Sequence, residues 1–242
     1  TLPLPPNVKR ADDAAATTVS VWRAVPTVVN AKFTGPYQND GREPTLEAQA
    51  LSAMRSHSEV TGDPATERLT RIAGFQRHLF SSARVKRMAR ALDDGMLPPS
   101  ADAPLGALEL QGRKTFEKFC ATCHGGATQT KNSDARFLPM PSRGPLTSGA
   151  QAFVNIFVGT PRPPPPALPP PAPTPRFFDE LPTAGLSDQT FLVTLPTQAA
   201  VTQPSSDAGR GLINGDLREF GRFDIPTLFG MAHTAPYFHD NS

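Results

Sequence analysis

Proline is the residue that most restricts what this chain can fold into. The 242 residues include 28 prolines and 18 glycines, whereas aromatic residues make up only 7%. Because proline cannot donate a backbone hydrogen bond, it is disfavoured inside helices and in central strands. We therefore expect a mainly α protein of short helices joined by long ordered loops, not one built on a continuous sheet.

The densest run of prolines is TPRPPPPALPPPAPTPR, residues 160–176. Such a run favours the extended polyproline II conformation, which has no internal hydrogen bonds. We expect a stiff external insertion that acts as a spacer. A docking strip for a partner protein is the alternative interpretation.

Length and charge set further limits. Two domains suit 242 residues, and the linker-like stretch DDGMLPPSADAPLG places their boundary near Leu105, giving domains 1–104 and 105–242. The 24 basic and 22 acidic residues leave a net charge of only +2, too weak a field to indicate a nucleic-acid partner. No apolar run is long enough for a membrane span, and TLPLPPNVKR lacks the layout of a secretion signal.

Three segments have helical patterns. Thr45 can cap a helix that runs to about Ser56, with Glu47 in its first turn. The segment 67–92 carries apolar residues at helical spacing and predicts one amphipathic helix or a pair of helices. A further helix is expected to start near Leu105 and to end in the sequence FCATCHGG, residues 119–126.

That sequence holds the two cysteines of the chain, as Cys-Ala-Thr-Cys-His. The pattern has three interpretations: a redox dithiol, part of a metal site, or covalent haem attachment. A structural zinc site needs a second pair of ligands, and a dithiol does not need the histidine. Haem c fits best: Cys120 and Cys123 would form thioethers, and His124 would bind the iron as axial ligand. Bacteria make these thioethers outside the cytoplasm, so we expect a periplasmic or extracellular protein.

The second axial ligand of this haem stays open. Four residues have suitable side chains: Met140, Met231, His233 and His239. Met140 lies in FLPMPS, and a methionine beside prolines is similar to the distal ligand of small class I cytochromes c. Methionine more often serves as an adaptable core residue, however.

Two segments far apart in the chain echo each other: PTVVNAKFTGPY at 26–37 and PTLFGMAHTAPY at 226–237. The second, extended to FDIPTLFGMAHTAPYFHDNS, resembles the PTLRNVALTAPYFHDGS signature of the bacterial dihaem cytochrome c peroxidase and MauG family. The first, within VPTVVNAKFTGPYQNDGREPTLEAQALSAM, resembles the block PTLLNVAFNAPLFWDGRAATLEEQALGPI of the same family. The resemblance runs from residue 21 to residue 242 apart from the proline-rich insertion.

The resemblance implies two cytochrome c-like helical domains, each with a haem. The first haem would react with peroxide or oxygen, and the second, held by His124, would relay electrons. The first domain's own haem motif is not in these 242 residues, and the family's distal ligand to the second haem would fall after Ser242. We therefore expect the sequence to be part of a longer polypeptide, cut at both ends, with the first domain incomplete. The alternatives are that the protein has lost its catalytic haem or that a partner chain supplies it.

The resemblance also assigns catalytic residues. The family's distal glutamine and glutamate match Gln49 and Glu59, where a carboxylate can move a proton between peroxide oxygens and an amide can orient them. The alternative for Glu59 is a solvated charge at a helix end. Two positions depart from the family: Ala53 replaces a proline, and Asn39 replaces the tryptophan between the haems, for which Tyr37 or Trp22 could substitute.

A calcium ion lies between the domains in this family. The carbonyls of Thr234 and Pro236 match two of its ligands, but Ala24 occupies the position of an asparagine ligand, which weakens the expectation. By the same resemblance, His239 packs beside the second haem.

The function that follows is reduction of hydrogen peroxide, with electrons passing through the His124 haem from a small cytochrome c or a cupredoxin. A homodimer or a larger complex is compatible with the sequence. Two alternatives remain: oxidation of an organic or protein substrate in the manner of MauG or a rubber oxygenase, and a non-catalytic electron-transfer subunit.

Overall fold

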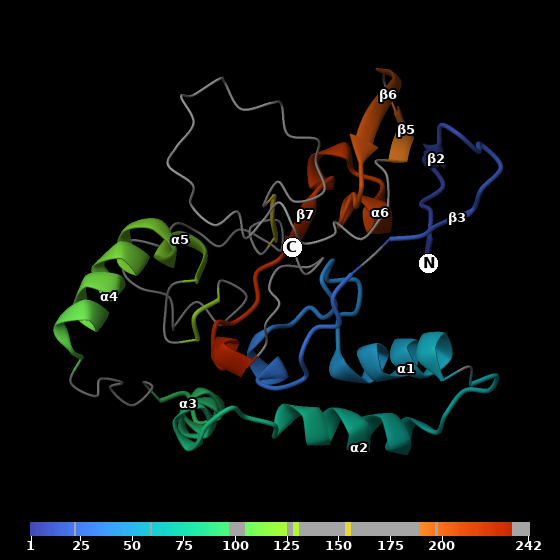
Figure 1. Cartoon of the computed structure of the whole chain (residues 1–242). Coiled ribbons are helices and arrows are strands. Elements are labelled where there is room, and N and C mark those ends of the chain that lie inside the picture. The colour runs from blue at the N-terminus through green and yellow to red at the C-terminus, as the bar shows by residue number, and fades with distance from the viewer. Residues whose placement is uncertain are drawn as a thin grey trace, which may run out of the picture. The chain divides into compact units, whose positions relative to one another are not determined.

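The structure is a computed structural model that describes residues 1–21, 23–58, 60–96, 105–124, 128–130, 153–155, 189–196 and 198–233. Along the described part of the chain, strands β1–β3 come first, helices α1–α5 follow, and strands β4–β6 come after them, before α6 and β7 (Figure 1). The α-helices are α1 (Leu46–His57), α2 (Thr66–Arg77), α3 (Ala83–Asp93), α4 (Ala107–Phe119), α5 (Ala121–His124) and α6 (Gly211–Asn214). Short 3-10 helices are η1 (Ala31–Phe33), η4 (Leu217–Glu219) and η5 (Met231–His233).

The described residues also form seven strands, and these overturn the prediction of a mainly α protein made of two cytochrome c-like helical domains. They are β1 (Leu2–Pro3), β2 (Val8–Arg10), β3 (Thr18–Val19), β4 (Phe153–Asn155), β5 (Gln189–Leu195), β6 (Gln198–Ser205) and β7 (Arg222–Asp224). The error came from averaging composition over the whole chain. Locally, QTFLVTL of β5 is rich in β-branched and apolar residues, and this composition favours a strand.

The chain divides into two compact units, each assembled from segments far apart in sequence. Unit 1 comprises Thr1–Pro26, Val154–Phe223 and Ala235–Ser242, and unit 2 comprises Thr27–Phe153 and Asp224–Thr234. The boundary predicted near Leu105 follows residues 97–104, which lie outside the described part, and it stays a prediction. No helix among the described residues is long and apolar enough to cross a membrane.

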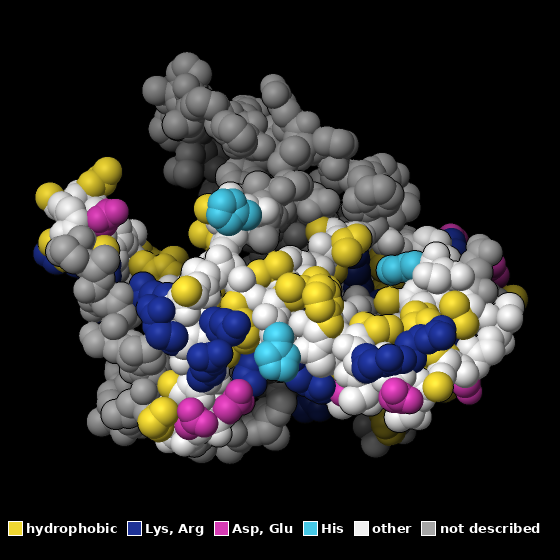
Figure 2. Space-filling model, turned by 90° about the horizontal axis from the view of Figure 1, so that it is seen from below, with side chains coloured by type: hydrophobic (Ala, Val, Ile, Leu, Met, Phe, Trp, Pro, Cys, Tyr) yellow, Lys and Arg dark blue, Asp and Glu magenta, His cyan; other side chains and the backbone are white. Residues whose placement is uncertain are grey.

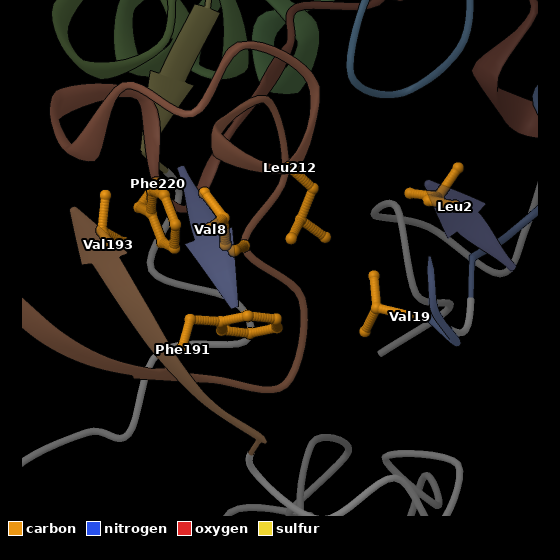
Figure 3. Close-up of a cluster of buried hydrophobic side chains, with 8 residues drawn as sticks. Leu2, Val8, Val19, Phe191, Val193, Leu212 and Phe220 are labelled. Carbon is orange, nitrogen blue, oxygen red and sulfur yellow. The ribbon is translucent and has the colours of Figure 1, made fainter. Parts of the chain in front are cut away.

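Unit 1 is built around an antiparallel sheet in the order β2-β5-β6. Val8 pairs with Val193 and Arg10 with Phe191, so alternate residues of both strands point to the same face. Phe191 and Phe220 meet edge to face with ring centroids 6.1 Å apart. Figure 3 shows the apolar side chains of this cluster, which comprises Leu2, Val8, Val19, Phe191, Val193, Ala208, Leu212 and Phe220.

A buried ion pair adds a specific polar contact to unit 1. Arg23 donates from Nε and Nη2 to the two carboxylate oxygens of Asp207, at 2.6 and 2.8 Å. The backbone N–H of Gly209 donates to the same carboxylate at 2.8 Å. Both charges are therefore hydrogen-bonded away from bulk water, as a buried pair requires.

Unit 2 contains α1, α2 and α3, and its core lies beside the η1 turn. Ala31 packs with Leu46 of α1 and Ala73 of α2. Phe33 packs with Val85 and Ala89 of α3. The outer face of α3 carries exposed Arg84, Lys86, Arg87 and Arg90, and Figure 2 shows dark blue basic side chains interspersed with apolar ones on this side of the molecule.

Over residues 27–33 and 227–233, both within the described part of the chain, the two echoed sequences adopt the same local structure. In each, a threonine hydroxyl accepts the N–H of the residue two positions ahead: Thr27 from Val29 at 3.1 Å and Thr227 from Phe229 at 3.4 Å. A left-handed residue follows in each copy, Asn30 with φ 65° and Gly230 with φ 78°, and it precedes η1 or η5. The two echoed segments form a repeated structural motif, and both copies of the turn belong to unit 2.

Asn30 joins the two copies. Its side-chain N–H groups donate to the Ser81 hydroxyl at 3.0 Å and to the Phe229 carbonyl at 2.9 Å. Its side-chain oxygen accepts the Ser81 N–H at 3.0 Å. Asn30 has a left-handed backbone conformation and a short polar side chain. Its hydrogen bonds therefore connect the turn before η1 to Ser81, just before α3, and to the second copy of the repeat.

We predict that Phe191→Ala destabilises the fold by about 3–5 kcal/mol, because it removes the ring at the centre of the unit 1 core. Urea unfolding followed by circular dichroism measures this free energy. Thr194→Ala, at an exposed position of the same strand, is the control and should change stability by less than about 0.5 kcal/mol. Equal effects of the two variants would show that the core does not depend on Phe191.

Candidate functional site

The cysteine motif continues the helical path of α4. At the start of α4, the N–H of the N-cap residue Gly106 donates to the Glu109 carboxylate at 2.7 Å. At the other end, the Cys120 N–H donates to the Phe116 carbonyl at 2.8 Å, and the N–H groups of Cys123 and His124 donate to the Cys120 carbonyl at 3.0 and 2.9 Å. Because side chains three apart share one face of a helical turn, the two thiols are placed on the same side.

Both cysteines are free thiols. Cys120 is exposed and Cys123 is half-buried. Among the described residues, no group of three or more His, Cys, Asp or Glu side chains is arranged to hold a metal ion. The predicted pair is therefore present as two separate thiols one helical turn apart.

His124 is held in a defined environment. Its Nδ1 lies 3.3 Å from the Gln129 carbonyl oxygen, which can only accept a hydrogen bond, so the proton resides on Nδ1. Burial lowers the pKa of His124 below its ordinary value, and hydrogen bonds with the backbone of Gln129 and Pro226 act in the opposite direction. The ring is neutral at pH 7, and Nε2 carries the lone pair that a metal ligand needs.

The helix before the motif has an uncovered apolar surface. No residue of α4 is buried. Leu108 is 80% exposed and Phe119, next to the motif, is 67% exposed. Two thiols one turn apart, an imidazole held through Nδ1 and adjacent uncovered apolar side chains fit the requirements of a covalently attached haem.

Gln49, the first predicted distal residue, lies on α1. Thr45 caps this helix as predicted, accepting the Ala48 N–H at 3.1 Å. The half-buried Gln49 side chain accepts a hydrogen bond from Nε2 of Gln76 on α2 at 3.2 Å. The Gln76 Oε1 is buried and has no hydrogen-bond partner within the described part of the chain. The sequence analysis missed Gln76, since a glutamine followed by Arg77 and His78 on a helix gives no signal of burial.

Of the other predicted residues, some lie within the described part of the chain and some lie outside it. Tyr37 is half-buried beside the Ala31 cluster, and burial raises the pKa of its phenol. Met231 is 46% exposed, and both it and the exposed His233 belong to η5. Several candidates lie outside the described residues, so their roles stay predictions: Glu59, Thr234, Pro236, Met140, His239, Trp22 and the insertion 160–176.

Comparisons with known proteins bear on the fold. No model of a protein family matches the chain, and no curated protein matches it. Among solved structures, it is similar to a MauG-like protein associated with microbial copper homeostasis, with a TM-score of 0.51 and 19% sequence identity. The match covers 94% of this chain and 57% of that one, so the chain spans little more than half the length of its structural neighbour. The chain thus shares the fold of a MauG-like protein, in agreement with the resemblance of its two echoed segments.

Acidification should destabilise the haem-free chain through His124. Because the pKa of His124 is lowered by folding, the unfolded chain binds a proton at higher pH than the folded chain does. The neutral His124 ring therefore contributes to the free energy of unfolding in urea at pH values above the ordinary histidine pKa of about 6.5. We expect this contribution to be lost as the pH falls from there toward the lower pKa of His124 in the folded chain.

His124→Gln should make the unfolding free energy less dependent on pH in this range. If His124→Gln keeps the wild-type pH profile, His124 does not titrate differently in the two states.

Proposed function

We propose that this chain is the haem c-binding part of an oxidoreductase, and that it reduces hydrogen peroxide with electrons relayed through a haem held by Cys120, Cys123 and His124. The observation that supports this most is the placement of His124: its Nδ1 faces the Gln129 carbonyl, and the residue directly follows the second of two free thiols. The shared fold with a MauG-like protein supports the same class of activity.

The cysteines would attach the haem without any change of oxidation state. Each thiol adds across one vinyl group, so a C–S bond forms, the S–H proton moves to the neighbouring vinyl carbon and nothing leaves. Cys120 is exposed and Cys123 is half-buried, which suits this addition. His124 would hold the iron through Nε2, and a bound haem would supply a centre that takes up and passes on one electron at a time.

Gln49 and Glu59 would handle the peroxide at the site of another haem. The Gln49 Oε1 accepts from Gln76, so the Gln49 N–H groups face away from that bond as donors for a peroxide oxygen. A Glu59 carboxylate would take the proton from the near peroxide oxygen and deliver it to the far one. With two electrons and two protons, one hydrogen peroxide then yields two waters.

We also propose a place for each half of the chain, an electron donor, a location and a calcium site. Residues 105–242 would hold the relay haem, and residues 1–104 would contribute the wall of a second haem site in a longer protein. The electron donor would be a small cytochrome c or a cupredoxin, outside the cytoplasm, and the protein would act alone or as a dimer or larger complex. A calcium ion would use the carbonyls of Thr234 and Pro236.

A second function, oxidation of an organic or protein substrate, has one observation in its favour. Asn39 stands where the peroxidase resemblance places a tryptophan between the haems, and the Asn39 carbonyl accepts the Asp224 N–H at 2.8 Å. An amide side chain cannot serve as an aromatic relay for electrons. Peroxide consumption supported by a reduced donor protein favours peroxidase activity, whereas consumption that requires an oxidisable substrate favours the alternative.

Covalent attachment should depend on both cysteines. Produced in cells that attach haem c, the wild-type chain should retain its haem through extraction with acidified acetone, because thioether bonds survive this treatment. The double variant Cys120→Ser, Cys123→Ser should release all of its haem into the solvent. A pyridine haemochrome assay of both fractions measures the distribution, and extraction of the wild-type haem would refute the attachment.

Replacing the proposed proton shuttle should slow peroxide cleavage. We expect Glu59→Gln to lower the rate by about 10²–10⁴-fold, the usual contribution of a positioned acid or base. The absorption spectrum of the His124 haem should stay unchanged. Stopped-flow mixing of the full-length protein with peroxide gives the rate, and Glu67→Gln, at an exposed position of α2, is the control. A rate equal to that of the wild type would remove Glu59 from the mechanism.

A further inference from the structure

Two threonine hydroxyls join the loop after the cysteine motif to the second copy of the repeated motif. Thr227 donates from Oγ1 to the Thr128 carbonyl at 2.7 Å. In the opposite direction, Thr130 donates from Oγ1 to the Ile225 carbonyl. Thr128 and Thr130 are fully buried. The bond from Thr130 is therefore shielded from solvent, and the bond from Thr227 is partly shielded. The three residues 128–130 are thus fastened at both ends to residues 225–227.

The residue between these two attachment points has an unusual backbone conformation. Gln129 has φ 54°, in the left-handed region that residues with a Cβ rarely occupy. Such a conformation persists only where the surrounding structure enforces it. The Gln129 carbonyl is the group that faces Nδ1 of His124 at 3.3 Å. The two hydroxyl bonds therefore hold the loop in the conformation that presents this carbonyl to the histidine.

The opposite segment is arranged in the same way. Pro226 lies between Ile225 and Thr227, the two residues that take part in the hydroxyl bonds. Its backbone also forms a hydrogen bond with the His124 ring. Each of the two backbone groups that contact His124 is thus flanked on both sides by residues of the threonine bonds.

The first copy of the repeat provides an internal comparison. Thr27 has the same local bond as Thr227, from the N–H two residues ahead, at 3.1 Å. Ile225 is 2% exposed, whereas its counterpart Val25 is 87% exposed. In the second copy, burial at this position thus occurs together with the cross-bonds to loop 128–130, whose Gln129 carbonyl faces His124.

We propose that Thr130 and Thr227 are positioning residues for the axial ligand His124, acting through the carbonyl of Gln129 and the backbone of Pro226. This inference rests on the proposed function, since it assigns a role toward the attached haem. A carbonyl that accepts from Nδ1–H fixes the ring orientation, keeps the proton off Nε2 and makes the imidazole a stronger donor to the iron. A stronger donor stabilises ferric over ferrous iron and lowers the reduction potential.

The test uses the haem-loaded protein and measures its midpoint potential by spectroelectrochemistry. Thr227→Val and Thr130→Val remove a hydroxyl at nearly constant volume. Each should raise the potential, by up to about 59 mV, which corresponds to a tenfold shift of a one-electron couple toward the reduced form. Thr227→Ser keeps the hydroxyl and should restore the wild-type potential.

Thr27→Val is the matched control, because it removes the same local bond in the first copy. It should leave the potential of the His124 haem unchanged. Thermal unfolding of each variant separates positioning from general stability, since a merely structural threonine would lower the melting temperature without moving the potential. Thr130→Val could fail to fold because Thr130 is fully buried. In that case the midpoint potential of Thr227→Val tests the inference, since Thr227 is only partly buried.

The outcomes are distinct. Raised potentials in the valine variants, with rescue by serine and no change in Thr27→Val, support the inference. Wild-type potentials in the valine variants of a protein that carries covalent haem overturn the positioning role and leave the proposed function intact. A wild-type protein without covalent haem overturns the proposed function, and the positioning role with it.

Discussion

The hydrogen bond between Nδ1 of His124 and the Gln129 carbonyl, with a 3.3 Å separation, sets what the cysteine motif can do. A histidine at the end of a short helix could rotate, take either tautomer and become protonated near neutral pH. Here a carbonyl fixes the proton on Nδ1, and burial lowers the pKa so that the ring stays neutral. The result is an imidazole ready to donate from Nε2, beside two thiols on the same helical turn.

Residues distant in the sequence build this environment. The helix and its cysteines come from residues 107–124, the carbonyl comes from the loop 128–130, and the supporting segment comes from residues 225–227. The same second copy of the repeat receives the Asn30 side chain through the Phe229 carbonyl. One segment therefore contacts both the loop beside the candidate haem site and the first copy beside α1 and α3. The two copies share a backbone conformation, yet they have different neighbours.

Sequence reasoning succeeded where the signal was local. Thr45 caps α1 as predicted. The segment 67–92 forms a pair of helices, one of the two predicted forms, and the structure adds that Ser82 caps the second of them, α3. The cysteine motif and the repeated motif are short patterns with fixed spacing, so they could be found without knowing the fold. The strands could not be found from overall composition, because β2 pairs with β5 across more than 180 positions. Nor could the role of Gln129, since its left-handed conformation is imposed by contacts with residues nearly 100 positions away.

We propose that a haem is bound covalently through Cys120 and Cys123, and mass spectrometry of one peptide tests this most directly. Trypsin cleaves after Lys118 and Lys131, which releases FCATCHGGATQTK with both cysteines. Protein isolated from cells that attach haem c should yield this peptide with the mass of one haem added and with no thiol left to alkylate. Recovery of the peptide at its unmodified mass, with both thiols alkylated, would contradict the account.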